Sequence, residues 1–377
     1  MIPFIDLAAQ FAAREAAIRA RMNAVLAHGK YIMGPEVQEL EKRLAAYAGA
    51  PHCVGCASGT DALLLPLMAE GVGPGDAVIT TSFTFIATAE VISLLGARPV
   101  FVDIDPDTWN ISPQAVEDCL AAWTPSWGRP RAIIAVDIFG LPADAAALTR
   151  IADAHDLLLI EDAAQSFGGS LDGRRACSFG HYAATSFFPA KPLGCYGDGG
   201  AVFCADGERA ARIDSLRVHG KGTDKYDNVR IGLNSRLDTL QAAILLAKLD
   251  HFDEEIAARQ RVAATYGAAL APLGQAGVAQ HIPAGATSAW AQYSLLARNG
   301  EARAAAQTAL KAAGVPTAVY YPTPLHLQTA FAHLGYRPGD LPVCEDVCGR
   351  IFSLPMHPYM PDGQAESIAS TVAKALV

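Results

Sequence analysis

The feature that most constrains the fold is a series of short apolar runs, each followed by a polar or acidic residue. These runs occupy residues 77–80, 99–102, 132–136 and 157–160. Stretches with helical composition separate them, a pattern typical of a mostly parallel sheet in an α/β fold. Ligands bind outside the carboxyl ends of the strands in such sheets. The sequence therefore predicts a site along that rim.

The length of 377 residues, 51% of them hydrophobic, allows a sizeable core and more than one domain. We expect a large domain over residues 1–250, beginning with a helical segment, and a smaller α/β domain over residues 251–377. Residues 235–270 carry a 3.6-residue apolar stripe with few breakers, which predicts one long helix leading out of the large domain.

Charge and hydropathy exclude several classes of partner. The formal net charge is -9 and the basic residues are scattered, which argues against nucleic acid or an anionic membrane surface. The N-terminus lacks a signal-peptide pattern, and no apolar run approaches the roughly 20 residues that span a bilayer. We therefore expect a cytoplasmic protein that acts on small molecules.

The eight cysteines are too sparse for a disulfide scaffold. Two close pairs, Cys53 with Cys56 and Cys344 with Cys348, leave a four-thiolate zinc site as an alternative. The pairs lie far apart in the sequence and lack the turn residues of a zinc knuckle, so we expect no metal.

One lysine occurs where covalent chemistry is favoured. Lys191 lies between an aromatic pair followed by proline and a glycine-rich turn, with a strand candidate at residues 201–203. If it is half-buried among Phe187, Phe188 and Leu193, its amine loses hydration, which lowers its pKa and favours the neutral nucleophile. Lys191 is therefore a candidate Schiff-base lysine, and an ordinary loop lysine is the alternative.

Two other features fit the same chemistry. A strand expected at residues 52–56 leads through Ser58, Gly59 and Thr60 into a helix, and free backbone N–H groups at such a helix start bind phosphate. Asp162 follows a buried strand. Pyridoxal 5′-phosphate needs a lysine, a carboxylate at its pyridine nitrogen and a phosphate-binding turn. A helix-capping role for Asp162 remains the alternative.

Three neighbouring positions can complete such a site. Ser186, five residues before Lys191, can donate its hydroxyl to the phosphate. Phe85 can cover one face of the cofactor ring, and the small Ala164 leaves room on the other.

Four motifs in order resemble the DegT-type nucleotide-sugar aminotransferases, which share the aspartate-aminotransferase fold, or fold type I, of pyridoxal-phosphate enzymes. The resemblance covers nearly the whole chain, and the motifs are Glu161-Asp-Ala-Ala-Gln-Ser166, Ser186-Phe-Phe-Pro-Ala-Lys191, Gly194-Cys-Tyr-Gly-Asp-Gly-Gly200 and Gly232-Leu-Asn-Ser-Arg-Leu-Asp-Thr-Leu-Gln-Ala-Ala243. It implies a large domain with a mostly parallel sheet and a smaller C-terminal domain. A branch of the family that dehydrates sugars has histidine in place of the lysine, so Lys191 argues against that branch.

The resemblance also implies a role for each matched position. Lys191 would hold the cofactor, Asp162 would face the pyridine nitrogen, and Gln165 would lie beside the ring and its hydroxyl. The phosphate contacts would come from Gly59, Thr60, Ser186 and, across a homodimer with composite sites, Asn234 of the second subunit. Ala190 and Pro192 depart from the residues common in relatives without touching a catalytic atom.

Within the aminating branch, the motifs around residues 288–294 and 314–328 look most like enzymes that act on C3 of a UDP-linked 2-acetamido-3-keto-hexuronic acid. L-glutamate would supply the amino group, and the product would serve surface polysaccharide synthesis, such as that of lipopolysaccharide O-antigen. The residues expected around the sugar are Arg236, Tyr320, Tyr321 and His326.

Other functions stay open at this point. The same cofactor residues would serve amination of a 4-keto-6-deoxy or 3-keto-6-deoxy nucleotide sugar. A non-catalytic pyridoxal-phosphate regulator would keep Lys191 and Asp162, although no basic helix-turn-helix segment is visible. A dinucleotide-binding oxidoreductase would need a G-x-G-x-x-G motif after the first strand, which the sequence lacks.

Overall fold

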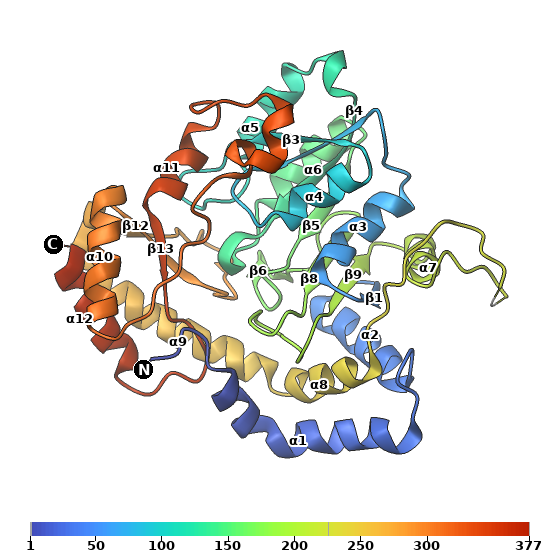
Figure 1. The fold of residues 1–377 in the computed structure, drawn as a ribbon, viewed down its shortest axis with the longest axis horizontal. Helices are drawn as coiled ribbons and strands as arrows, with labels where there is room; N and C mark the ends of the chain where they lie inside the picture. Colours follow the sequence, from blue (N-terminus) through green and yellow to red (C-terminus); the bar gives the residue numbers. More distant parts are fainter. Residues whose placement is uncertain (1, 225, 377) are drawn as a thin grey trace.

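The computed structural model describes residues 2–224 and 226–376. At its centre is a seven-stranded sheet with the order β1-β9-β8-β5-β4-β2-β3 (Figure 1). Within these residues β9 alone runs antiparallel to its neighbours, which confirms the mostly parallel sheet. Its strands are β1 (His52–Cys56), β2 (Asp76–Thr81), β3 (Arg98–Val102), β4 (Arg129–Val136), β5 (Leu158–Asp162), β8 (Tyr182–Ser186) and β9 (Gly200–Cys204).

Helices cover both faces of this sheet because its strands bury side chains on both sides. On one face the core joins the sheet to α3 (Gly59–Ala69), α4 (Ala87–Leu94) and α7 (Gly207–Leu216). On the other face it joins the sheet to α2 (Pro35–Ala48), α5 (Pro113–Ala121), α6 (Ala145–Ala154) and α8 (Thr239–Leu249). The fold is therefore a three-layer α/β arrangement, as expected.

The long helix expected over residues 235–270 is wrong in two respects. The chain is not helical before Thr239, and the helix is interrupted between α8 and α9 (Phe252–Leu270) at Asp250 and His251. Three acidic residues fill the first turn of α9, where the positive end of a helix dipole stabilises negative charge. Phe252 is buried in the core beside α2, so the apolar stripe is continuous while the backbone is not.

The C-terminal part packs around a smaller antiparallel sheet of β10 (Gly277–Ala279), β12 (Tyr293–Ala297) and β13 (Ile351–Leu354). Figure 1 shows α10 (Gly300–Ala312) and α12 (Gln364–Leu376) beside this sheet, and their apolar side chains share a core with α9. The first helix, α1 (Leu7–His28), packs along α8 through Ile18.

The remaining elements connect these layers. They are a small sheet of β6 (Ser170–Leu171), β7 (Arg174–Arg175) and β11 (Ala286–Thr287), helix α11 (Pro342–Arg350), and the 3-10 turns η1 (Pro125–Trp127), η2 (Ile138–Gly140), η3 (Ala271–Ala276), η4 (Leu325–Leu327) and η5 (Thr329–Leu334). Across the described ranges, no helix has both the length and the apolar character to cross a bilayer.

Candidate functional site

The parallel strands bring the predicted residues to one rim. Asp162 ends β5, Ser186 ends β8, and Ser58 follows β1 closely, so all three lie at the carboxyl edge of the sheet. The loop from Phe187 to Gly199 joins β8 to β9 on the same edge and carries Lys191. The prediction of a shared rim is therefore confirmed.

The lysine loop is closed by its own backbone. The Phe187 N–H donates to the Gly199 carbonyl at 2.7 Å, and the Cys195 N–H donates to the Phe187 carbonyl at 2.8 Å. The expected shielding of Lys191 is only partly right, because Phe187 and Leu193 lie in the core whereas Phe188 is 53% exposed. The chain turns at Pro189, directly after the exposed Phe188.

Lys191 is partly buried, and in the described chain its amine has no partner of its own. Burial lowers the pKa of its amine, and the opposing attraction of Asp162 is the smaller effect. Within residues 2–224 and 226–376, no hydrogen bond or ion pair engages this amine. The amine is therefore free to react with a carbonyl.

Asp162 is 5% exposed and is held in a fixed orientation. Its Oδ2 accepts a hydrogen bond from the Thr88 hydroxyl at 2.7 Å, and Oδ1 accepts one from the Ala164 N–H at 3.3 Å. Burial raises the pKa of this carboxyl, while these bonds and Lys191 oppose the rise. A buried carboxylate with so few partners is suited to a cationic ligand.

Gln165 and Tyr321 form the next part of the site. The side-chain oxygen of Gln165 accepts from the Phe139 N–H at 2.8 Å, and its amide nitrogen donates to the Tyr321 hydroxyl at 3.3 Å. Burial, followed by the charge of Asp162, raises the pKa of Tyr321. Phe85 is 55% exposed, and its ring centroid lies 6.5 Å from that of Tyr321.

The turn before α3 forms a cradle of hydrogen-bond donors. Ser58 caps the helix by accepting from the Asp61 N–H at 3.1 Å, which leaves the N–H groups of Gly59 and Thr60 without a partner in the helix. A Cβ on Gly59 would lie 2.6 Å from the Cβ of Ser186. Glycine is therefore required here, and it brings the Ser186 hydroxyl against the helix start.

The donors and charges of this rim fit pyridoxal 5′-phosphate. The cradle offers backbone N–H groups and a hydroxyl to a dianion, Asp162 offers a carboxylate to a ring nitrogen, and Lys191 offers an unpaired amine.

Asn234 and Arg236 line a different cavity of about 510 Å³ in the same chain. Its other lining residues are Ile32, Ala57, Gly197, Asp198, Asp238 and Gln241. Asn234 is exposed and Arg236 is half-buried. Gly197 and Asp198 belong to the lysine loop, but Lys191 itself is not among the described residues that line this cavity.

His326, expected near the sugar, is held by protein groups. Its side chain is buried, Nδ1 lies 2.7 Å from the Ser82 hydroxyl, and Nε2 lies 3.1 Å from Glu345. Both ring nitrogens are thus occupied by protein groups. Tyr320, in contrast, is only partly buried and stacks edge-on against Tyr321 and Phe4.

Sequence reasoning missed several residues that support the rim. Thr88, in the first turn of α4, bonds both Asp162 and the Thr84 hydroxyl, and the spacing of two threonines by four residues was a usable signal. Behind Asp162, the carboxyls of Asp137 and Glu161 face each other in the core. The sequence pattern marks both as acidic residues that follow apolar runs, but it does not indicate that they meet.

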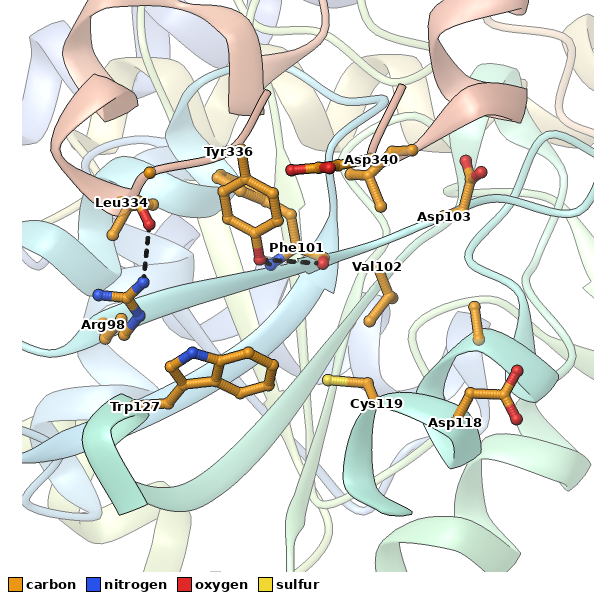
Figure 2. A pocket seen from close by; sticks show the side chains of 13 residues that line it. Arg98, Phe101, Val102, Asp103, Asp118, Cys119, Trp127, Leu334, Tyr336 and Asp340 are labelled. Carbon is orange, nitrogen blue, oxygen red and sulfur yellow. Dashed lines mark hydrogen bonds between the residues drawn. The ribbon is translucent and has the colours of Figure 1, made fainter. Parts of the chain in front are cut away.

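A second cavity, of about 500 Å³, lies along the outer edge of β3 (Figure 2). The Tyr336 hydroxyl accepts from the Phe101 N–H at 2.8 Å and donates to the Phe101 carbonyl at 3.1 Å, while Arg98 donates to the Leu334 carbonyl at 2.9 Å. These contacts satisfy the backbone of an edge strand. The described residues that line this cavity include none of the predicted site residues.

The two cysteine pairs lie in different parts of the core, Cys53 beside α2 and Cys344 with Cys348 in α11. Within the described parts of the chain, no three histidine, cysteine or acidic side chains gather as a possible metal site.

Comparisons with known proteins agree over almost the whole chain. A model of the DegT/DnrJ/EryC1/StrS aminotransferase family matches residues 13–373. The chain is 50% identical over 372 residues to a UDP-2-acetamido-2-deoxy-3-oxo-D-glucuronate aminotransferase of Pseudomonas aeruginosa, with 99% of each protein covered.

Solved structures give the same result. A DegT DnrJ EryC1 StrS aminotransferase from Brucella abortus is 50% identical with a TM-score of 0.94, over 99% of this chain and 98% of that one. NtdA from Bacillus subtilis, solved with bound PMP, is 29% identical with a TM-score of 0.90, over 100% of this chain and 84% of that one. The chain thus belongs to the DegT/DnrJ/EryC1/StrS aminotransferase family, whose enzymes use pyridoxal 5′-phosphate.

Proposed function

We propose that this aminotransferase moves an amino group from L-glutamate to the 3-keto group of a UDP-linked 2-acetamido-3-keto-hexuronic acid, for surface polysaccharide synthesis in the cytoplasm. One observation supports the reaction type most directly. The Lys191 amine is partly buried, has no hydrogen-bond partner among the described residues, and lies close enough to Asp162 to be attracted by its charge. The acceptor is supported by the 50% identity to the Pseudomonas enzyme named for this keto sugar.

Each residue of the rim has a role in this proposal. Lys191 attaches the cofactor through its amine, and Asp162 keeps the pyridine nitrogen protonated. Gln165 lies beside the ring hydroxyl and Phe85 covers one ring face. The phosphate is bound by Gly59, Thr60 and Ser186. When bound, the cofactor supplies an electron-accepting ring that stabilises negative charge on the carbon that loses its proton.

Lys191 also moves the proton in this proposal. Burial lowers the pKa of its amine, which shifts the balance toward the neutral form, and the neutral Nζ can accept the proton from the α-carbon of glutamate. With the cofactor bound, Nζ would pass that proton to the cofactor's reactive carbon, and the same transfers would run backwards on the keto sugar. Because the donor product leaves before the acceptor binds, the kinetics are ping-pong.

The second half of the site comes from a second subunit. Asn234 is exposed and lines a cavity whose described lining residues do not include Gly59, Thr60, Ser186 or Lys191 of its own chain, so we assign it to the phosphate of the partner's site. Large apolar side chains near this face are exposed in a single chain: Tyr31, Ile32, Val229 and Ile231. A homodimer would cover them.

Subunit mixing tests this arrangement. Lys191→Ala and Asn234→Ala subunits should each be inactive, whereas hybrid dimers should recover activity because one of their two sites is intact. Homodimers of each variant, unfolded and refolded in the same way, are the controls. Verified hybrids that remain inactive beside an impaired Asn234→Ala homodimer would contradict the shared site.

The sugar specificity rests on Arg236, which lines the same cavity as Asn234 and would reach the substrate from the second subunit with it. Its guanidinium is planar and permanently charged, which suits the C6 carboxylate of a hexuronic acid, and Tyr320 and Tyr321 border the same substrate. A neutral 4-keto-6-deoxy sugar would leave this charge unpaired, at a cost of about 1–3 kcal/mol, or roughly tenfold or more in discrimination.

The experiment compares kcat/KM for UDP-linked 3-keto-hexuronic acid and for a 4-keto-6-deoxy nucleotide sugar. Wild type should prefer the acid, and Arg236→Ala should lose about tenfold of that preference, whereas exposed Arg298→Ala should keep it. A wild type that prefers the neutral sugar would contradict the substrate. Unchanged preference in Arg236→Ala would contradict only the role of this arginine.

A further inference from the structure

Helix α8 lies beneath the lysine loop and contacts it at two points. The side-chain oxygen of Gln241 accepts from the Tyr196 N–H at 2.9 Å, and its nitrogen lies 3.5 Å from the Tyr196 carbonyl. Two turns further along α8, the ammonium of Lys248 donates to the Gly194 carbonyl at 2.6 Å. Both side chains therefore point from one face of α8 to adjacent peptides of the loop.

Lys248 is a buried cation, only 1% exposed. Its Nζ lies 4.1 Å from the centre of the Tyr196 ring, and the nearest acidic groups are Glu255 on α9 and the Cys195 thiol. Both Glu255 oxygens are taken by Gln10 and Tyr359. In the described residues no carboxylate forms an ion pair with Lys248, so burial lowers its pKa to about 8.

The Gly194 peptide is tightly coupled to the segment that carries Lys191. A Cβ at Gly194 would lie 2.5 Å from the Pro189 carbonyl and 2.7 Å from the Phe188 carbonyl. That Phe188 carbonyl also accepts the Lys191 N–H at 2.8 Å. Any shift of Gly194 must therefore move the turn that holds Lys191.

We propose that Lys248 is a positioning residue, which fixes the Gly194 peptide and thereby holds the Lys191 amine at its reacting position. This inference rests on the proposed role of Lys191. If this residue only filled space, methionine would stabilise the fold more than lysine, because burying an ammonium without a carboxylate partner costs free energy. The lysine supplies what methionine cannot, a donor for a loop carbonyl.

The pH dependence of the loop has a defined sign. Opening the loop would expose Lys248 and return its pKa toward the usual value of 10.5, whereas the closed loop holds it at about 8. Raising the pH therefore favours the closed loop, in which the amine is neutral and still donates to Gly194. Between pH 8 and 9 the closed form should gain about fivefold over the open form.

The test is amide hydrogen exchange of residues 187–199 in the cofactor-free protein, corrected for intrinsic rates. Wild type should gain about fivefold protection from pH 8 to 9. Lys248→Met should lose this pH dependence and exchange about fivefold faster at pH 9, as expected for one lost hydrogen bond. Gln241→Met should loosen the loop at every pH but keep the wild-type pH dependence.

Exposed Lys311→Met is the control and should match wild type. In the holoenzyme, Lys248→Met should lower kcat several-fold and leave the acceptor KM unchanged.

A flat wild-type pH profile of loop exchange contradicts the proposal even if no variant folds. Faster exchange in β2, β4 and β5 as well as the loop would mean general destabilisation, and it would also overturn the proposal. Because the exchange is measured without cofactor, an error in the role of Lys191 would leave these results unchanged and would be found by cofactor mapping.

Discussion

Lys191 in the loop and Lys248 in the helix beneath it both lose hydration through burial, but their contacts differ. Lys248 bonds a carbonyl and lies over an aromatic ring. Within the described chain, Lys191 has no such partner and feels only the field of Asp162. The difference separates a group kept available for chemistry from a group used to hold the backbone. A similar contrast separates Asp162, which faces the site, from the buried pair Asp137 and Glu161 and from His326, whose ring nitrogens both have protein partners. Each of these residues can be tested.

The largest expected effect is at Lys191. Lys191→Ala should lower transamination by about 10³-fold or more, because it removes both the attachment point and the proton carrier. Borohydride should fix the cofactor covalently to wild type, and peptide mapping should find the label on Lys191 and not on Lys248. A label on Lys248 would reverse the comparison.

Asp162→Asn should lower kcat by about 10²–10³-fold while cofactor still binds, since an amide cannot keep the pyridine nitrogen protonated. Asp144, which caps α6, provides the matched control, because asparagine caps a helix as well as aspartate does. Asp144→Asn should have near wild-type activity. If Asp162→Asn does too, a capping role is the better description of Asp162.

The buried pair Asp137 and Glu161 should be visible in the pH dependence of stability. Burial raises the pKa of Asp137 to about 7 from 3.8. Its carboxyl therefore supports the fold fully below about pH 4, and this support is lost as the pH rises through about 7. Asp137→Asn does not titrate, so its free energy of unfolding relative to wild type should rise by about 2 kcal/mol between pH 5 and 6.5. Urea unfolding at several pH values measures this, and a constant difference would show that Asp137 is ionised in the fold.

The smallest effect is expected at His326, whose ring nitrogens are both engaged. His326→Ala should lower the free energy of unfolding by about 1–2 kcal/mol, because Ser82 and Glu345 each lose the contact that they make with the buried ring. The ratio of kcat/KM values for acidic and neutral acceptors should not change. A change in that ratio with unaltered stability would restore His326 to the sugar site.

Much of this arrangement could be predicted from the sequence, for identifiable reasons. Apolar runs that end in acidic residues indicate parallel strands, and the carboxyl ends of such strands share an edge, so Asp162, Ser186 and the lysine loop were brought together correctly. The family resemblance supplied the roles that spacing alone left open, and those roles, like the division at residue 250, remain predictions.

The errors concern features that depend on three-dimensional packing. The interruption between α8 and α9 has no glycine or proline, so periodicity could not locate it. The sugar contact of His326 stays a prediction, but the burial of its ring was also not visible in the sequence, because its partners Ser82 and Glu345 are distant in sequence or separated from it by a loop. Exposure of Phe188 beside buried Phe187 reflects the turn at the following proline, and aromatic character does not predict direction.

The antiparallel strand β9 has a consequence for how the site is assembled during folding. It pairs with β8 through the loop from Phe187 to Gly199, so closing this loop costs less chain entropy than pairing β9 with β1 does. The phosphate cradle follows β1, which pairs with β9 across some 150 residues of sequence. Contacts between residues close in sequence form faster than contacts between residues far apart in sequence. The lysine loop should therefore form before the phosphate cradle does. Until β1 pairs with β9, the chain would have the Lys191 amine in place but no site that binds the phosphate.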